Sequence, residues 1–177
     1  MMLTRRTFLF AGIAGASALA AAGWLRGRDG PSPLQAGTST PTLVPDAIKV
    51  LTAVTPLFLD GALPDDPAAA AAAVRDTIGN VGVAIAGLAP AAQQELGQLF
   101  ALLGFAPARI ALARVTSPWP EARDDEIAAF LERWRTSGFL LFQSAYAALH
   151  QLVFAAWYGN PDSWPAIGYP GPPRLSS

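Results

Sequence analysis

Hydrophobic residues recur at helical spacing in several segments of this chain, and prolines and glycines separate those segments. The first segment predicts a helix over 46–60, with apolar residues along one side: Ile48, Leu51, Val54 and Phe58. Further helices are predicted to begin at Asp66-Pro67 and at Pro90, where an acidic N-cap or a first-turn proline favours a helix start. Gly79 and Gly82 weaken the middle of the helix after Pro67 and could split it.

The segment from 124 to 136 has the cleanest amphipathic pattern, with apolar residues at i, i+3, i+4 and i+7. Its acidic residues lie in the first turn and its arginines, Arg133 and Arg135, lie in the last. The helix dipole favours this distribution. We therefore interpret these charges as an ordinary solvated face, in preference to a binding site.

The longest apolar helix is predicted over 139–158, which contains no charged residue. Its polar residues fall on one narrow stripe: Gln143, Ser144, His150 and Gln151. The rest of its circumference is apolar, and leaving that surface in water forfeits roughly 25 cal/mol per Å². Other elements of the chain, or another protein, are expected to cover it, and the shorter upstream helices are the natural cover.

Composition agrees with one helical domain. The chain has 177 residues and 52% hydrophobic content, and alanine and leucine outweigh β-branched residues. The predicted fold class is all-α, a small bundle of about five helices. The net charge of −1 comes without a cluster of Lys and Arg, so a nucleic-acid partner is not expected.

The N-terminal residues 1–25 resemble a twin-arginine export signal in the positions Arg5, Arg6, Phe8 and Leu9, ahead of an Ala/Gly-rich apolar run. The alternative is an uncleaved membrane anchor, which the run is just long enough to form. Cleavage is favoured because arginines also follow the run, against the positive-inside tendency. Residues 26–45 are predicted to be a flexible linker, and residues 46–177 the helical domain.

Candidate chemistry is sparse. The chain has no cysteine and one histidine, which excludes disulfides, thiolate-ligated clusters and cysteine nucleophiles. His150 has no carboxylate three or four residues away that could orient it as a base or a metal ligand. Neither a nucleophile elbow nor a phosphate-binding loop is present. No catalytic, cofactor-binding or metal-binding residue is predicted, and an enzyme working alone is not expected.

The tail from about 159 is rich in proline and aromatic residues and is predicted to be extended. Large aromatics on a stiff chain are typical of docking surfaces, because little entropy is lost on binding. The predicted partner interface comprises Trp157, Tyr158, Trp164, Ile167, Tyr169, Pro170 and Pro172. The alternative, equally open on physical grounds, is that the tail folds back and caps its own bundle.

The twin-arginine leader, the cysteine-free helical body and the ending WYGNPDSWPAIGYPGPP together resemble the gluconate 2-dehydrogenase subunit 3 family. The resemblance covers the leader and the last third of the chain. It implies a non-catalytic small subunit that escorts, exports and stabilises a periplasmic dehydrogenase of the glucose-methanol-choline class. FAD would lie in that large subunit, and a cytochrome c subunit can accompany it. The implied location is periplasmic, with membrane association through the complex or an uncleaved leader.

A second hypothesis, from another class, is a free-standing periplasmic helical protein that binds a ligand or serves as a scaffold. It predicts a monodisperse monomer when the chain is purified alone. The escort hypothesis predicts exposed apolar surface until a partner is present.

Overall fold

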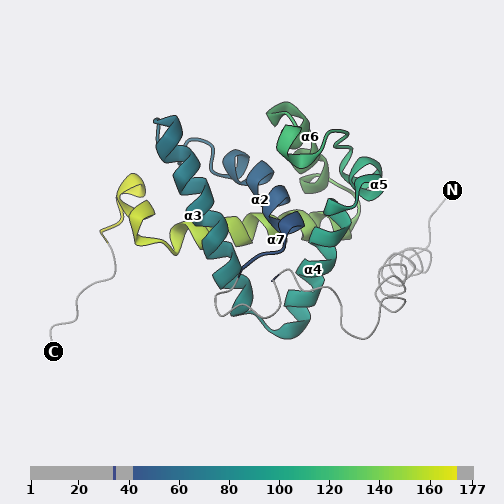
Figure 1. The fold of residues 1–177 in the computed structure, drawn as a ribbon, viewed down its shortest axis with the longest axis horizontal. Coiled ribbons are helices and arrows are strands. Elements are labelled where there is room, and N and C mark those ends of the chain that lie inside the picture. Colours follow the sequence, from purple (N-terminus) through teal and green to yellow (C-terminus); the bar gives the residue numbers. More distant parts are fainter. Residues whose placement is uncertain (1–33, 35–41, 171–177) are drawn as a thin grey trace. The chain divides into compact units, whose positions relative to one another are not determined.

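The computed structural model describes residue 34 and residues 42–170 (Figure 1). Every described residue belongs to one compact unit within Ser32–Ser177. The predicted export-signal residues Arg5, Arg6, Phe8 and Leu9 lie outside the described residues, as does Pro172.

The all-α class is confirmed, because the described residues form helices and no strand. The α-helices are α2 (Pro45–Phe58), α3 (Pro67–Ala86), α4 (Pro90–Gly104), α5 (Ala106–Ala108), α6 (Asp124–Arg135) and α7 (Leu140–Tyr158). Three short helices of other types connect or follow them: the π-helix η1 (Arg109–Ala113) and the 3-10 helices η2 (Trp119–Glu121) and η3 (Pro161–Ile167).

Helix starts follow the local chemistry of the sequence. A proline occupies the first turn of α2, α3 and α4, where its missing N–H costs nothing. The Asp66 carboxylate caps α3 by accepting a hydrogen bond of 2.8 Å from the Ala69 N–H, as the Asp-Pro pair predicts. Gly79 and Gly82 do not split α3, which runs unbroken to Ala86 because its apolar face packs on α7 and α2.

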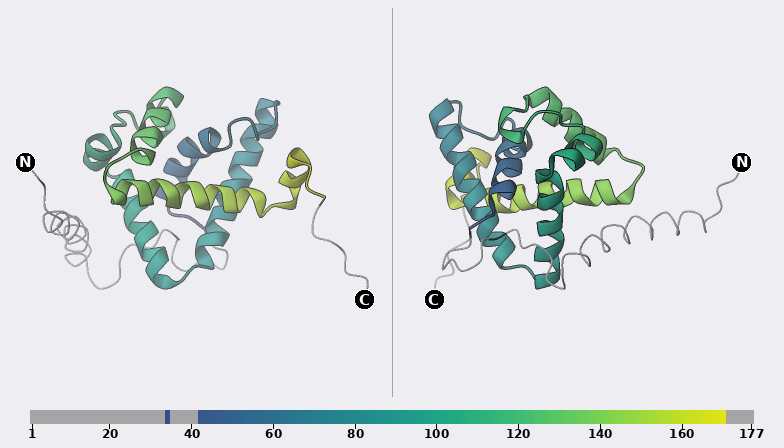
Figure 2. Two further views of the ribbon diagram at one scale, coloured as in Figure 1. Left: turned by 180° about the vertical axis from the view of Figure 1, so that it is seen from behind. Right: turned by 45° about the vertical axis from the view of Figure 1, so that its right-hand side comes forward.

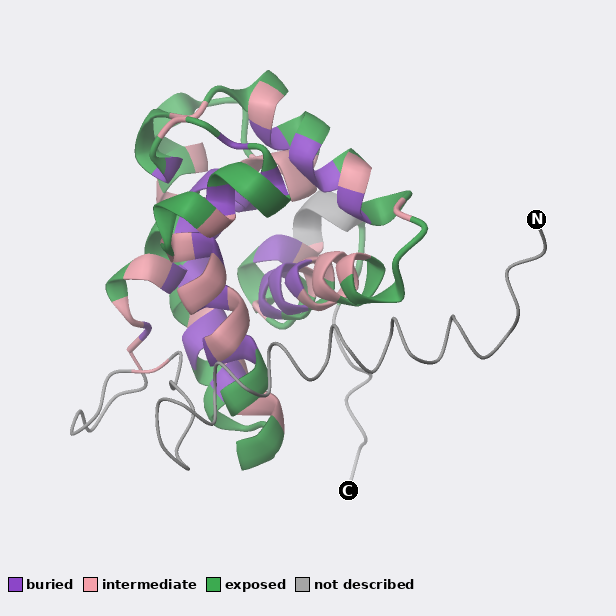
Figure 3. Ribbon diagram, turned by 90° about the vertical axis from the view of Figure 1, so that its right-hand side faces the viewer, coloured by how far each residue is buried: buried purple, intermediate pink, exposed green. Residues whose placement is uncertain are grey.

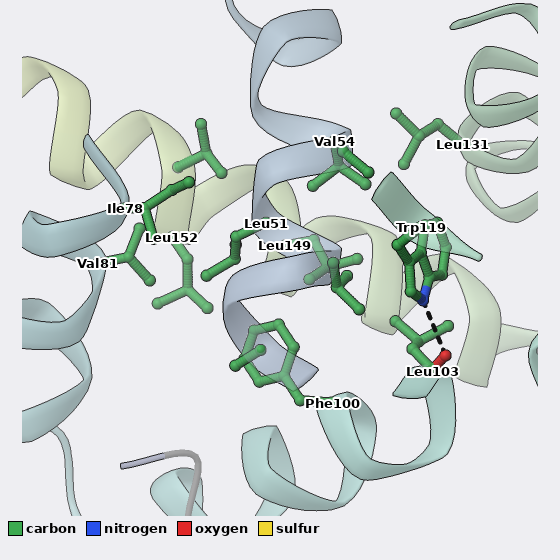
Figure 4. Packing of buried hydrophobic residues seen from close by; sticks show 14 of the residues in the cluster. Leu51, Val54, Ile78, Val81, Phe100, Leu103, Trp119, Leu131, Leu149 and Leu152 are labelled. Carbon is green, nitrogen blue, oxygen red and sulfur yellow. Dashed lines mark hydrogen bonds between the residues drawn. The ribbon is translucent and has the colours of Figure 1, made fainter. Parts of the chain in front are cut away.

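α7 runs through the unit and packs against α3, α6 and α2 (Figures 1 and 2). α4 packs against α2 on the far side of the core. The buried side chains come from all of the longer helices, and Figure 4 shows Leu51, Ile78, Phe100 and Leu149 converging. Each such side chain contributes about 1.5–3 kcal/mol when fully buried.

A tryptophan from a connecting segment completes this core. Trp119 belongs to η2 and is almost wholly buried, and its indole Nε1–H donates to the Leu103 carbonyl at 2.9 Å (Figure 4). The hydrogen bond satisfies the polar atom that an indole brings into a core. The Trp-Pro segment that breaks the helical pattern therefore serves as packing between α4 and α6.

Two predicted segments differ from the structure. Part of the predicted linker 26–45 belongs to the core, since Leu43 is buried and forms an isolated bridge with Leu34. A composition rich in proline and threonine does not outweigh the gain from burying a leucine. The tail predicted to be extended from 159 instead forms η3, a 3-10 helix that Gly168 ends with a φ of 68°.

Candidate functional site

His150 occupies a structural position. Its ring lies 4.2 Å from the ring of Phe154 in a stacked arrangement and 5.3 Å from that of Phe58 in an edge arrangement. No ion pair or hydrogen bond joins it to another residue in the described part of the chain. Over the same part of the chain, no group of three His, Cys, Asp or Glu side chains is placed to hold a metal ion. The imidazole is therefore an aromatic packing element on α7.

The C-terminal end of α7 is covered by the chain itself. Trp157 is only 6% exposed and packs in the core, so its assignment to a partner interface is wrong. The Ser163 hydroxyl donates to the carbonyls of Trp157 and Asn160, each at 2.8 Å, and this turns the chain back toward the helix. The capping alternative therefore describes this part of the tail.

Three of the remaining predicted interface residues, Tyr158, Trp164 and Tyr169, form a smaller cluster beside that turn. The Trp164 indole donates to the Tyr158 carbonyl at 2.9 Å and meets the Tyr169 ring at 5.1 Å. Tyr158, Tyr169 and Pro170 are exposed, and their role in binding stays a prediction. The side chain of Ile167 is outside the described set.

The N-terminal end of α7 is exposed and apolar. Phe139, Leu140 and Leu141 are 70%, 71% and 52% exposed, and the turn between α6 and α7 is almost entirely green in Figure 3. No side chain caps this helix start. The apolar pattern predicts that this helix is covered by other elements or by another protein, but it does not say which part stays exposed. Three successive apolar residues point in directions about 100° apart and cannot all face one neighbour.

An aromatic stack ties this end of α7 to α6. The Phe142 ring stacks on the Trp134 ring at 5.2 Å and meets the Phe139 ring edge-on at 6.1 Å. The Trp134 indole also donates to the Leu112 carbonyl at 3.1 Å. Leu112 itself is exposed near the end of η1.

Two arginines lie beside this surface. Arg133 on α6 is half-buried and donates to the Ala113 carbonyl, which differs from its predicted place on a solvated face. Arg114 follows Ala113 and is exposed. Burial lowers the pKa of the Arg133 guanidinium, and the nearby charge of Arg114 lowers that pKa further. We call the set Leu112, Arg114, Arg133, Phe139, Leu140 and Leu141 the α6–α7 corner.

A groove of about 950 Å³ lies on another part of the unit, between the α2–α3 connection and α6. Its floor includes the apolar side chains of Phe58, Leu131 and Tyr146. Its charged lining is mostly acidic: Asp60, Asp65, Asp124, Asp125 and Glu132, with Arg135. Arg135 is paired with Glu132, so the unpaired charges in the groove are negative.

No protein-family model, curated protein or solved structure matches this chain. Within the described ranges, no single helix combines the length and the apolar composition needed to cross a membrane. The consecutive pair Pro90–Gly104 and Ala106–Ala113 meets both conditions together but is bent by 84°.

Proposed function

We propose that this chain is the non-catalytic small subunit of a periplasmic FAD-dependent dehydrogenase of the glucose-methanol-choline class. In this proposal it binds the large subunit, stabilises it and directs its export through the twin-arginine translocase. The chain binds no cofactor, and FAD belongs to the large subunit. A cytochrome c subunit is a further expected member of the complex.

The observation that carries the proposal is the exposed apolar surface of the α6–α7 corner. Leu140 and Leu141 lie in the first turn of α7, and Phe139 directly precedes it. Exposed apolar area costs roughly 25 cal/mol per Å² until something covers it, and contiguous patches of this kind mark protein interaction sites. A subunit that works only in a complex accounts for this surface.

A non-catalytic role also agrees with the surroundings of the one histidine. His150 is held between aromatic rings with no carboxylate to orient it, so it lacks what a general base requires. The resemblance to an export signal at Arg5 and Arg6 supplies the reason for binding before export, because the twin-arginine pathway carries folded proteins.

The test is to express the neighbouring flavoprotein gene with and without this chain. The proposal expects the large subunit to reach the periplasm and carry activity only when this chain is present. A variant with Arg5 and Arg6 replaced by lysine is the matched control, since it keeps the charge and loses the paired arginines. Unchanged export and activity of the flavoprotein without the chain would refute the proposal.

A second candidate function, a free-standing ligand-binding protein, is favoured by the acidic groove between the α2–α3 connection and α6. Its unpaired carboxylates above an apolar floor suit a cationic ligand with an apolar part. This candidate expects a soluble monomer that is stabilised thermally by such a ligand, without any partner protein.

A further inference from the structure

Arg114 has a backbone conformation that its side chain does not favour. Its φ of 54° and ψ of 27° lie in the left-handed region, and it is the one non-glycine residue with a positive φ among residues 42–170. An L-residue with a Cβ pays a steric cost in this region, and such strain clusters at binding sites where the surrounding structure enforces it.

Side chains on both sides of Arg114 enforce that conformation. Before it, the carbonyls of Leu112 and Ala113 accept hydrogen bonds from Trp134 and Arg133. After it, the buried Arg109 donates to the carbonyls of Val115 and Thr116, at 3.2 and 3.4 Å. The Glu126 carboxylate also accepts from the Thr116 N–H and hydroxyl. The backbone of Arg114 is therefore held on both sides.

The guanidinium of Arg114 has no partner in this arrangement. Across the described ranges, no hydrogen bond or ion pair joins Arg114 to another residue, and none joins Arg133 to a carboxylate. By contrast, Arg123, just before α6, pairs with Asp125, and Arg135, at the end of α6, pairs with Glu132. Neither arginine therefore pairs with a carboxylate among the described residues.

Trp134 links the apolar residues of the same corner to the segment that carries Arg114. The Trp134 indole donates a hydrogen bond to the Leu112 carbonyl, and its ring stacks on the Phe142 ring. The Phe142 ring in turn contacts the Phe139 ring. Leu140 and Leu141 follow directly. An occupant of this corner must therefore present apolar side chains to α7 and negative charge to Arg114 and Arg133.

We propose that the α6–α7 corner is the docking surface for the large subunit, and that Arg114 and Arg133 bind carboxylates of an apolar, acidic patch on it. This inference rests on the proposed function and names its interface. A protein occupant is favoured because the corner combines two arginines that pair with no carboxylate among the described residues with the exposed side chains of Phe139, Leu140 and Leu141. A protein patch that is both apolar and acidic complements both parts of this surface.

The first experiment measures binding of the purified chain to the co-expressed flavoprotein subunit. Arg114→Glu and Leu140→Asp are each expected to weaken binding about tenfold or more, as for residues central to an interface. Their controls, Arg75→Glu and Val83→Asp, make the same changes at exposed positions on α3 and are expected to leave binding within about twofold. Circular dichroism and thermal unfolding verify that each variant is folded.

The outcomes separate this inference from the proposed function. If the wild-type chain forms no complex with the flavoprotein, the proposed function fails. If the wild-type complex forms and both corner variants bind as tightly as the controls, the docking surface lies elsewhere and this inference is overturned.

A second experiment identifies the chemistry of the contact. Arg114→Lys keeps the charge and supplies an amine that a carbodiimide joins to a neighbouring carboxylate without a spacer. Mass spectrometry is expected to find a cross-link from Lys at this position to an Asp or Glu of the large subunit. Sedimentation with vesicles of phosphatidylglycerol and phosphatidylcholine is the competing arm. Vesicle binding that Arg114→Glu abolishes, without any cross-link, would overturn the inference in favour of a lipid surface.

Discussion

The two ends of α7 have similar composition and opposite surroundings. In the C-terminal half, Leu149, Val153 and Trp157 are buried, and the turn at Ser163 closes over the helix end. At the N-terminal end, Phe139 and Leu140 are largely exposed, with no side chain capping the helix. The difference shows that apolar composition identifies a surface to be covered, whereas the neighbouring elements decide whether the chain covers it itself.

The sharpest test of this contrast substitutes leucine by alanine at a buried position in the middle of α7 and at its exposed first residue. Leu149→Ala is expected to lower the free energy of unfolding by about 2–5 kcal/mol, because it leaves a cavity at a fully buried position. Leu140→Ala is expected to change it by less than about 0.5 kcal/mol. Urea unfolding followed by circular dichroism measures both, and equal losses would remove the distinction between the ends.

The next test concerns the turn that closes the C-terminal end. Ser163→Ala removes the hydroxyl bound to the carbonyls of Trp157 and Asn160, and is expected to cost about 1–2 kcal/mol. Ser144→Ala, at an exposed position of α7, is the control and is expected to be neutral. Thermal unfolding distinguishes them, and a neutral Ser163→Ala would mean that the turn does not hold the tail against the helix.

A third test asks whether the backbone at Arg114, in the α6–α7 corner, stores strain. Arg114→Gly relieves the left-handed conformation, and Arg114→Val worsens it because valine is β-branched. The glycine variant is expected to be more stable than the valine variant by about 1–2 kcal/mol, while both lose partner binding. Equal stabilities would show that the loop relaxes freely and does not present Arg114 in a fixed position.

The smallest expected effect depends on pH. Hydrogen bonding from the Thr116 backbone N–H holds the pKa of the Glu126 carboxyl below its ordinary value of 4.5. A lowered pKa in the folded state stabilises the protein above the unfolded value, and that contribution is lost as the pH falls through the folded value. Glu126→Gln is therefore expected to be less stable than the wild type at neutral pH, with the difference closing below about pH 4.5. A difference that stays constant from pH 7 to pH 3 would contradict this.

Sequence predicted most of the local structure and little of the candidate site. Helix starts at Pro45, Pro67 and Pro90 follow from local chemistry, and the apolar periodicity identified the helices that pack on α7. The whole apolar surface of α7 was expected to be covered by upstream helices or by another protein. Periodicity does not reveal where neighbouring helices end, so it did not identify the exposed start of α7. The conformation of Arg114 carried no local signal, since side chains distant in sequence impose it. Trp157 was assigned to an interface because tryptophan suits both a core and a docking surface.

The central claim is that the N-terminal end of α7 is where this chain meets its partner. The most direct test is amide hydrogen exchange of the chain alone and with the co-expressed flavoprotein subunit. The amides of Leu140 and Leu141 donate no hydrogen bond within the described residues and exchange fast in the free chain, so protection is easy to detect there. Slower exchange is expected at 112–116 and 139–142 in the complex. Slower exchange at 158–169 alone, with unchanged rates at the α6–α7 corner, would contradict it.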